Sequence, residues 1–376
     1  MVKKRKTILL YALLFIFWSG YSCTSEDSKY TEIGHVLLVY LGGDNNLSDE
    51  ASLKLDALSR GWQSDPKSKI LVYLDSRDKP PRLLEIDGKG SFGTLRQYEE
   101  ENSAGKNVFR RVITDTKALY PQASFNLLVF SHASGWLPAG TLSSPKSAGK
   151  VKTILADGDD EMELPDFAEA IPDKAFHTII FEACFMAGIE VAYQLKDKAN
   201  YIVASSAEIL SPGFTYIFPH EVSKLVHSDN EQFIDAAFNY FNQQTGDMNS
   251  ASFSLIKTDS LDALAGYIRQ NCDFSKEVPV SDIQHFDRYS YHLFFDFEDY
   301  FSRLMPEDKR EGLHILINNV VAHKLATKAF MPGYNGFTIN KHSGLTTYIM
   351  QEEFTRLNQE YTYLDWYYAV TKTKKK

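Results

Sequence analysis

The fold is decided by residues 177–188, His-Thr-Ile-Ile-Phe-Glu-Ala-Cys-Phe-Met-Ala-Gly. The apolar residues 178–181 predict a buried strand, and residues 186–196 predict the helix that follows it. Cys184 lies between them, after the strand ends and where we expect the helix to begin. A buried strand that turns sharply into a helix is typical of a parallel sheet covered by helices.

A second segment of the same design lies upstream. Residues 125–130 predict another apolar strand, which ends in Ser131-His132-Ala133-Ser134-Gly135-Trp136. Neighbouring parallel strands have their carboxyl ends at one edge of the sheet, where open α/β sheets bind their ligands. If the two strands are neighbours, His132 and Cys184 emerge together at that edge.

This pair of residue types suits nucleophilic catalysis. Thiolate attack needs a deprotonated sulfur, a base and hydrogen-bond donors for the oxyanion. A helix N-terminus next to Cys184 would lower the pKa of its thiol, and His132 would act as general base or acid. On spacing alone, a structural cysteine explains the pattern better, because buried cysteines at strand ends are common.

The other apolar runs indicate an α/β protein. Strands alternate with helices up to about residue 250, which predicts a doubly wound, mainly parallel sheet. The remainder, residues 251–376, predicts a smaller and mostly helical part. The expected strands are residues 36–41, 70–74 and 201–204, and the expected helices include residues 48–60, 108–120, 261–270, 286–304 and 311–323.

The first residues indicate export. Residues 3–6, Lys-Lys-Arg-Lys, precede an apolar run at residues 8–18 that is too short to span a bilayer. Cys23 follows small residues, which resembles a bacterial lipoprotein signal over residues 1–22, with Cys23 lipidated and residues 23–33 as a tether. We therefore expect anchoring to a bacterial membrane, at the outer membrane or cell surface. An ordinary signal peptide that is cut nearby is the alternative.

Composition narrows the classes of partner. The 376-residue chain has a formal net charge of −9, which argues against binding to a nucleic-acid backbone. The sequence has no Gly-rich phosphate loop, no zinc-ligand spacing and no basic–aromatic stripe. Besides Cys23 and Cys184 the chain has Cys272, which we expect in the core, so no dense disulfide framework is present.

Several motifs together resemble the clostripain family of cysteine peptidases. The resemblance covers roughly residues 36–370 and implies a caspase-like α/β/α sandwich, shared with gingipains and legumains, over residues 34–250. The motifs are Asp44-Asn45-Asn46-Leu47, His132-Ala133-Ser134-Gly135-Trp136, Glu182-Ala183-Cys184-Phe185-Met186 and Gly344-Leu345-Thr346-Thr347-Tyr348.

The resemblance also implies an activity. Cys184 would be the nucleophile of a dyad with His132, and the backbone N–H groups of Cys184 and Ala133 would bind the oxyanion. Glu182 would line a pocket for lysine or arginine, so the substrates would be proteins or peptides cut after a basic residue through a thioester acyl-enzyme. Two residues depart from the family pattern. Ala133 replaces a glycine, which strains the turn if that position needs a positive φ, and Glu182 replaces an aspartate.

Further residues at strand ends are candidates for the substrate pocket. Asp44 and Asn45 either shape the pocket or cap the following helix, and Ser205 and Ser206 are pocket walls by the same logic. No cofactor is needed for the chemistry. The resemblance implies calcium dependence without identifying the ligands, and residues 157–160 lack the order of an EF-hand loop, which favours a solvated turn.

The segment between His132 and Cys184 suggests self-activation. Members of the family can cut themselves after a basic residue in this region, and Lys146 and Lys150 are the candidates. The alternative function is a catalytically inactive lipoprotein that uses the same fold as a binding module, and Ala133 is its main support.

Overall fold

The computed structural model describes residues 32–43, 47–77, 79–87, 90–138, 141, 154–157 and 160–371, and these belong to one compact unit. Five of the predicted site residues lie outside the described residues: Cys23, Asp44, Asn45, Lys146 and Lys150.

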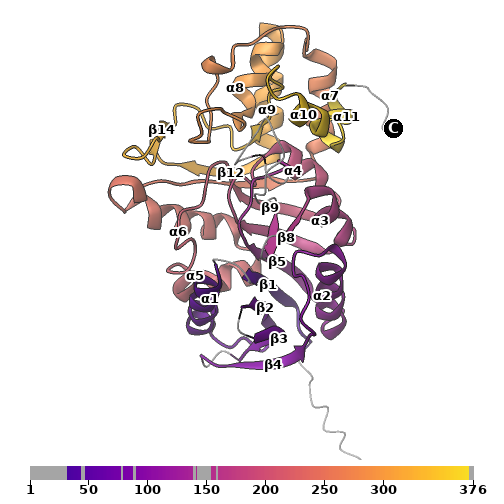
Figure 1. Cartoon of the computed structure of the whole chain (residues 1–376), viewed down its shortest axis with the longest axis vertical. Helices are drawn as coiled ribbons and strands as arrows, with labels where there is room; N and C mark the ends of the chain where they lie inside the picture. The colour runs from indigo at the N-terminus through magenta and orange to yellow at the C-terminus, as the bar shows by residue number, and fades with distance from the viewer. Residues whose placement is uncertain are drawn as a thin grey trace, which may run out of the picture. The chain divides into compact units, whose positions relative to one another are not determined.

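A nine-stranded sheet forms the centre of the molecule, in the order β12-β10-β9-β8-β5-β1-β2-β3-β4 (Figure 1). The five inner strands are parallel, as the alternation of strands and helices predicts. They are β1 (His35–Gly43), β2 (Ser68–Ser76), β5 (Ser124–Phe130), β8 (Phe176–Glu182) and β9 (Ala199–Ser205). The antiparallel outer strands are β3 (Lys79–Ile86), β4 (Phe92–Gln97), β10 (Ser252–Lys257) and β12 (Val321–Ala326).

Helices cover both faces of the sheet, which makes the sandwich that the resemblance implies (Figure 1). Alternate residues of β1 enter two separate apolar clusters, Val36 and Leu38 on one face and Leu37 and Val39 on the other. One cluster packs under α1 (Ser48–Gly61), α5 (Phe218–His227) and α6 (Asn230–Asn242). The other packs under α2 (Lys106–Leu119), α3 (Leu164–Ala170), α4 (Ile189–Gln194) and α7 (Leu261–Asn271).

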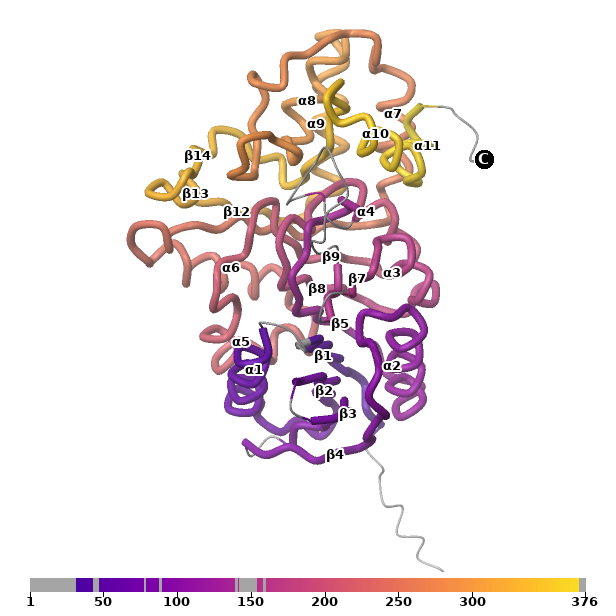
Figure 2. Tube along the Cα trace, in the orientation of Figure 1, coloured from indigo at the N-terminus to yellow at the C-terminus, as the bar shows by residue number. Residues whose placement is uncertain are grey.

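The chain beyond residue 250 is not independent of this sheet. It supplies β10 and β12, and the remaining elements gather at the β12 end of the sheet, around α4 (Figure 2). In that part, helices and strands alternate with loops. It contains α8 (Phe297–Phe301), α9 (Glu307–Val320), α10 (Thr355–Tyr361) and α11 (Asp365–Thr371), with short strands β11 (Phe295–Asp296), β13 (Ala329–Phe330), β14 (Phe337–Thr338) and β15 (Thr346–Thr347).

The predicted helix at residues 286–304 is wrong. Only α8 is α-helical there, and the residues before it form a loop. The carboxylate of Asp287 accepts hydrogen bonds from the backbone N–H groups of Leu293 and Phe294, which closes the loop on itself. A side chain that satisfies backbone donors in this way competes with helix formation.

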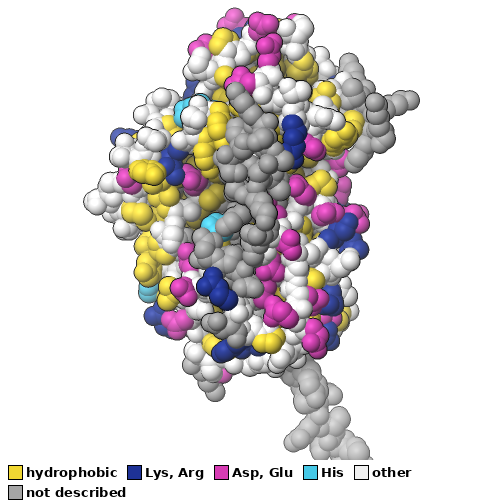
Figure 3. Space-filling model, viewed as in Figure 1, with side chains coloured by type: hydrophobic (Ala, Val, Ile, Leu, Met, Phe, Trp, Pro, Cys, Tyr) yellow, Lys and Arg dark blue, Asp and Glu magenta, His cyan; other side chains and the backbone are white. Residues whose placement is uncertain are grey.

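Acidic and basic side chains are mixed on one side of the molecule. Figure 3 shows many Asp and Glu side chains, mixed with Lys and Arg, on the side of the molecule that carries α2 and α3. Lys106 of α2 contacts Asp166 and Glu169 of α3 across this surface. Exposed pairs of this kind contribute little to stability. Within the described part of the chain, no helix is both long enough and apolar enough to cross a membrane.

Candidate active site

The two segments singled out in the sequence meet at one edge of the sheet. Strands β5 and β8 are parallel neighbours, and their last aligned pair is Phe130 with Glu182. His132 and Cys184 each lie two residues beyond that pair. The predicted adjacency of the two strands is therefore confirmed, and both residues leave the sheet at the same edge and the same register.

The loop that follows β5 packs directly against the turn that follows β8. Gly135 has a φ of +65°, and a Cβ added to it would lie 2.8 Å from the carbonyl oxygen of Phe185. Only glycine tolerates both this backbone conformation and this approach. The loop of His132 and the turn of Cys184 are thus in contact, and His132 and Cys184 are both partly exposed.

The turn after Cys184 is tightly constrained. Phe185 has a φ of 62°, a left-handed conformation that is rare for a bulky residue and that clusters at functional sites. Its N–H donates to the carbonyl of Ala207 (3.0 Å), and the N–H of Ala187 donates to the carbonyl of Ser205 (2.9 Å). The segment that follows β9 therefore runs alongside the turn that carries Cys184.

The prediction of a lowered thiol pKa is wrong for this state of the molecule. Helix α4 begins at Ile189, not at residue 186, so no helix N-terminus abuts Cys184. Although the Cys184 residue keeps some exposed surface, the groups packed around its thiol desolvate the sulfur, which raises the pKa of the thiol to about 12. A hydrogen bond from the backbone of Ile209 lowers it, the Glu208 carboxylate raises it and Arg288 lowers it. The thiol is therefore protonated at neutral pH.

The predicted oxyanion donors are compatible with the backbone. Ala133 is not among the described non-glycine residues with a positive φ, because the left-handed residue of its loop is Gly135. The strain considered for Ala133 therefore does not arise. Within the described part of the chain, the N–H groups of Ala133 and Cys184 donate no hydrogen bond.

Glu182 does not face an open pocket, which corrects its predicted role. Its side chain is 1% exposed and lies 2.5 Å from Nζ of Lys54, whose side chain is 0% exposed. The N–H of Phe214 donates to the same carboxylate (2.5 Å), and Lys54 also donates to Oγ1 of Thr215 (2.8 Å). A Cβ on Gly213 would lie 2.1 Å from Oε1 of Glu182. The charge of Glu182 is thus balanced inside the protein.

Sequence reasoning missed Lys54, although a signal was present. Ala51, Leu55 and Leu58 lie on the buried face of α1, and Lys54 occupies the same face. A lysine on an apolar helix face indicates a buried ion pair, because an unpaired buried ammonium is too costly.

The acidic residue beside the thiol is Glu208, three residues after β9 ends. It stands between Ala207, whose carbonyl binds the N–H of Phe185, and Ile209, whose backbone binds the Cys184 sulfur. Arg288 donates to both of its carboxylate oxygens, from Nε (2.6 Å) and from Nη2 (2.9 Å). Sequence reasoning did not weigh Glu208, although it follows the end of a strand next to β8.

Ser205 and Ser206 are not exposed pocket walls, which is a second correction. Both are 0% exposed. The Ser205 hydroxyl lies 3.1 Å from that of Ser252, and the Ser206 hydroxyl lies 3.3 Å from Nε2 of His342. These two serines are buried among neighbouring side chains and do not line an open pocket.

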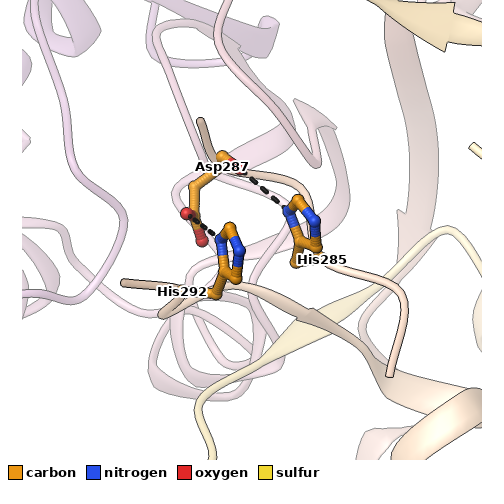
Figure 4. A group of neighbouring side chains, drawn as sticks. All are labelled: His285, Asp287 and His292. Atoms are coloured by element: carbon orange, nitrogen blue, oxygen red, sulfur yellow. Dashed lines mark hydrogen bonds and ion pairs between the residues drawn. The ribbon is translucent and has the colours of Figure 1, made fainter. Parts of the chain in front are cut away.

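A possible metal-binding group was also absent from the sequence prediction. His285, Asp287 and His292 have ligand atoms within 4.8 Å of one another, and among the described residues they form the one such group (Figure 4). Imidazole nitrogens suit transition metals and not the predicted calcium. The two rings stack at 3.6 Å with an interplanar angle of 17°, so their in-plane lone pairs do not converge on one ion. We call these three residues the His–Asp cluster.

The hydrogen bonds of the cluster stabilise the loop that contains it. Nδ1 of His292 lies 2.8 Å from Oδ1 of Asp287, and Nδ1 of His285 lies 2.9 Å from the Asp287 carbonyl oxygen. Burial, followed by the neighbouring His292, lowers the pKa of His285. The calcium dependence that the family resemblance implies stays a prediction.

Comparisons with known proteins agree with this arrangement. A family model described as the clostripain family matches residues 39–372. An inactive zymogen C11 protease from Parabacteroides distasonis superposes with a TM-score of 0.78 at 29% identity, covering 89% of this chain and 97% of that one. A secreted C11 cysteine protease from Bacteroides thetaiotaomicron, solved with an irreversible peptide inhibitor, gives 0.76 at 26% identity, covering 89% and 98%. No curated protein matched the chain.

Replacing Lys54 should destabilise the fold strongly. Lys54→Met leaves the buried Glu182 carboxylate without its counter-ion, which we expect to lower the free energy of unfolding by about 3–5 kcal/mol in urea titration. Adding Glu182→Gln should restore most of the loss. Equal stabilities for the single and the double variant would show that the pair is not coupled, and Lys106→Met, at an exposed pair, is the matched control.

The Cys184 thiol should react slowly in the intact chain. With a pKa of about 12, its thiolate fraction at pH 7.5 is so small that alkylation by iodoacetamide should be at least about 100-fold slower than that of a free cysteine peptide. The rate should keep rising through pH 10. Peptide mapping by mass spectrometry measures each cysteine separately, and a plateau below pH 8 would contradict the raised pKa.

Proposed function

Because the chain belongs to the clostripain family of cysteine proteases, we propose that it cleaves peptide bonds after lysine or arginine with Cys184 and His132 as its catalytic dyad. One observation carries the proposal. The register of β5 with β8, together with the approach of Gly135 to Phe185, brings the two residues to one sheet edge.

The mechanism follows from the groups at this edge. His132 takes the thiol proton as the Cys184 sulfur attacks the scissile carbonyl carbon. The N–H groups of Ala133 and Cys184 hold the oxygen that becomes negative. The tetrahedral adduct collapses to a thioester as the protonated His132 delivers its proton to the departing amine. Water, deprotonated by His132, then hydrolyses the thioester and restores the thiol.

Selectivity for a basic side chain requires an accessible carboxylate, and we assign this role to Glu208 in place of Glu182. Glu208 is 22% exposed at its side chain and stands beside the nucleophile turn, whereas Glu182 is paired with Lys54. Charge-assisted hydrogen bonds to a carboxylate are strong when they are shielded from water.

We infer a latent intact chain rather than an inactive binding module. A structurally similar protein is itself an inactive zymogen, and this chain keeps both dyad residues, His132 and Cys184, at one edge of the sheet. We propose that cleavage after Lys146 or Lys150 converts the latent chain into the active enzyme.

Export and anchoring complete the proposal. A secreted relative supports export. The basic residues 3–6, the apolar run and Cys23 support a lipid anchor on a bacterial membrane. The intact mass of protein extracted from membranes would show whether Cys23 is the lipid-modified first residue.

Removing either dyad residue should abolish catalysis. We expect Cys184→Ala to reduce the hydrolysis of fluorogenic peptides that end in lysine or arginine to background, and His132→Ala to reduce it at least about 100-fold. Cys272→Ala is the matched control and should retain activity, since Cys272 follows α7 and its thiol contacts the Phe301 carbonyl. A peptidyl chloromethyl ketone that labels no cysteine even after the chain has been cleaved would favour the binding-module alternative.

Self-cleavage should be visible in the mass of the purified protein. We expect fragments that end at Lys146 or Lys150 in the parent protein and an intact chain in Cys184→Ala. The variant with both lysines replaced by glutamine should stay intact and latent. Full activity from an uncut chain would refute the proposed activation.

A further inference from the structure

Glu208 already has a cationic partner in this structure. Arg288 binds it with two parallel hydrogen bonds, the bidentate geometry that matches a guanidinium to a carboxylate. A third nitrogen, Nη1, donates to the carbonyl of Tyr334 (3.1 Å), and the guanidinium lies 5.3 Å from the centre of the Tyr334 ring. The carboxylate beside the thiol is therefore occupied by an arginine of the same chain.

The segment that carries Arg288 lies over the nucleophile turn. The ring of Phe294 stacks on that of Phe185 at 4.3 Å and 10°, and the ring of Tyr289 lies 6.4 Å from it. The charges of Glu208 and Arg288 both act on the Cys184 thiol. The ion pair thus lies beside the turn that carries the thiol, because neighbours of both Glu208 and Arg288 contact Phe185.

The His–Asp cluster fixes this segment. Asp287, the residue before Arg288, is 0% exposed and binds His292 with Oδ1 and the N–H groups of Leu293 and Phe294 with Oδ2 (Figure 4). The backbone at Arg288 is therefore pre-organised, and its side chain reaches Glu208 from a defined position.

We propose that Arg288 is an internal competitor of the substrate for Glu208, so that a basic substrate side chain binds only by displacing it. This inference rests on the proposed function, because it concerns the same pocket. Lys54 cannot play the same part, since it is fully buried with Glu182. The Arg288 side chain, by contrast, is 16% exposed and therefore in contact with solvent.

Displacement favours arginine over lysine and over neutral side chains. A substrate guanidinium replaces the two hydrogen bonds that Arg288 gives up, so the exchange conserves charge and hydrogen bonding. A lysine ammonium supplies a point charge and cannot reproduce the fork. A neutral side chain leaves the Glu208 carboxylate desolvated and unpaired, which is costly. Arg288 therefore raises the threshold for every side chain that has to bind Glu208.

Equilibrium binding tests this without relying on catalysis. Full-length chain with Cys184→Ala is titrated with three peptides that differ only in the last residue, arginine, lysine or citrulline. Citrulline has the shape of arginine without its charge. We expect Arg288→Gln to tighten binding of the arginine peptide at least tenfold and of the citrulline peptide less than twofold. Adding Glu208→Gln should abolish that gain.

Each other outcome overturns the inference. Equal tightening for arginine and citrulline would show that Arg288→Gln only loosens the segment, and unchanged affinity would make the pair a static support. Weaker binding would mean that Arg288 itself contacts the peptide. If no variant binds a basic peptide, Glu208 is not a cation site. Arg288→Lys, which keeps the charge and loses the fork, should tighten the arginine peptide by less than Arg288→Gln.

The result is separable from the fate of the proposed function. Loss of peptide hydrolysis in the parent chain would count against the dyad and leave the binding titrations unaffected, because those use Cys184→Ala. Thermal unfolding of every variant checks that the segment around the His–Asp cluster stays folded.

Discussion

Everything at the site depends on the in-register pairing of β5 with β8. Because side chains alternate along a strand, a shift of one residue would turn the residues that follow each strand away from one another. The buried faces of both strands fix the register, since Leu127, Val129 and Ile179 must enter one apolar cluster and Leu128 and Ile180 the other. Packing of the sheet is thus what sets the separation of an imidazole and a thiol that are distant in sequence.

Two carboxylates lie at the ends of two neighbouring strands, Glu182 as the last residue of β8 and Glu208 after β9, and each has a different counter-ion. Glu182 and Lys54 are sealed from water, so neither can leave without stranding a buried charge. Glu208 and Arg288 sit at the margin of the fold, where a free cation can replace the bound one. Burial therefore decides which carboxylate holds the structure together and which can take part in recognition.

The sequence predicts what is local and periodic. Continuous apolar runs identified the parallel strands, and the residues after two of them identified the edge that carries His132 and Cys184. The contact of Lys54 with Glu182 joins residues 128 positions apart, and no local pattern encodes the partner. The spacing of aromatic residues around Phe294 predicts a helix. The N–H groups of Leu293 and Phe294 instead donate hydrogen bonds to the Asp287 carboxylate, so they are not available to a helix. Helix α4 begins later than predicted because Phe185 has a left-handed backbone conformation. A phenylalanine in the sequence gives no sign of that conformation.

The raised pKa of the thiol limits how the site can become active. Exchange of Arg288 for a substrate guanidinium leaves the charge next to Cys184 unchanged, so substrate binding alone does not ionise the sulfur. Burial is the largest cause of the raised pKa, and Glu208 is a smaller one. Two routes remain: a rearrangement that lets water or a donor reach the sulfur, or proton transfer to His132 in the same step as the attack. The first predicts a latent intact chain, and the second needs only that the imidazole and the substrate carbonyl approach the thiol together.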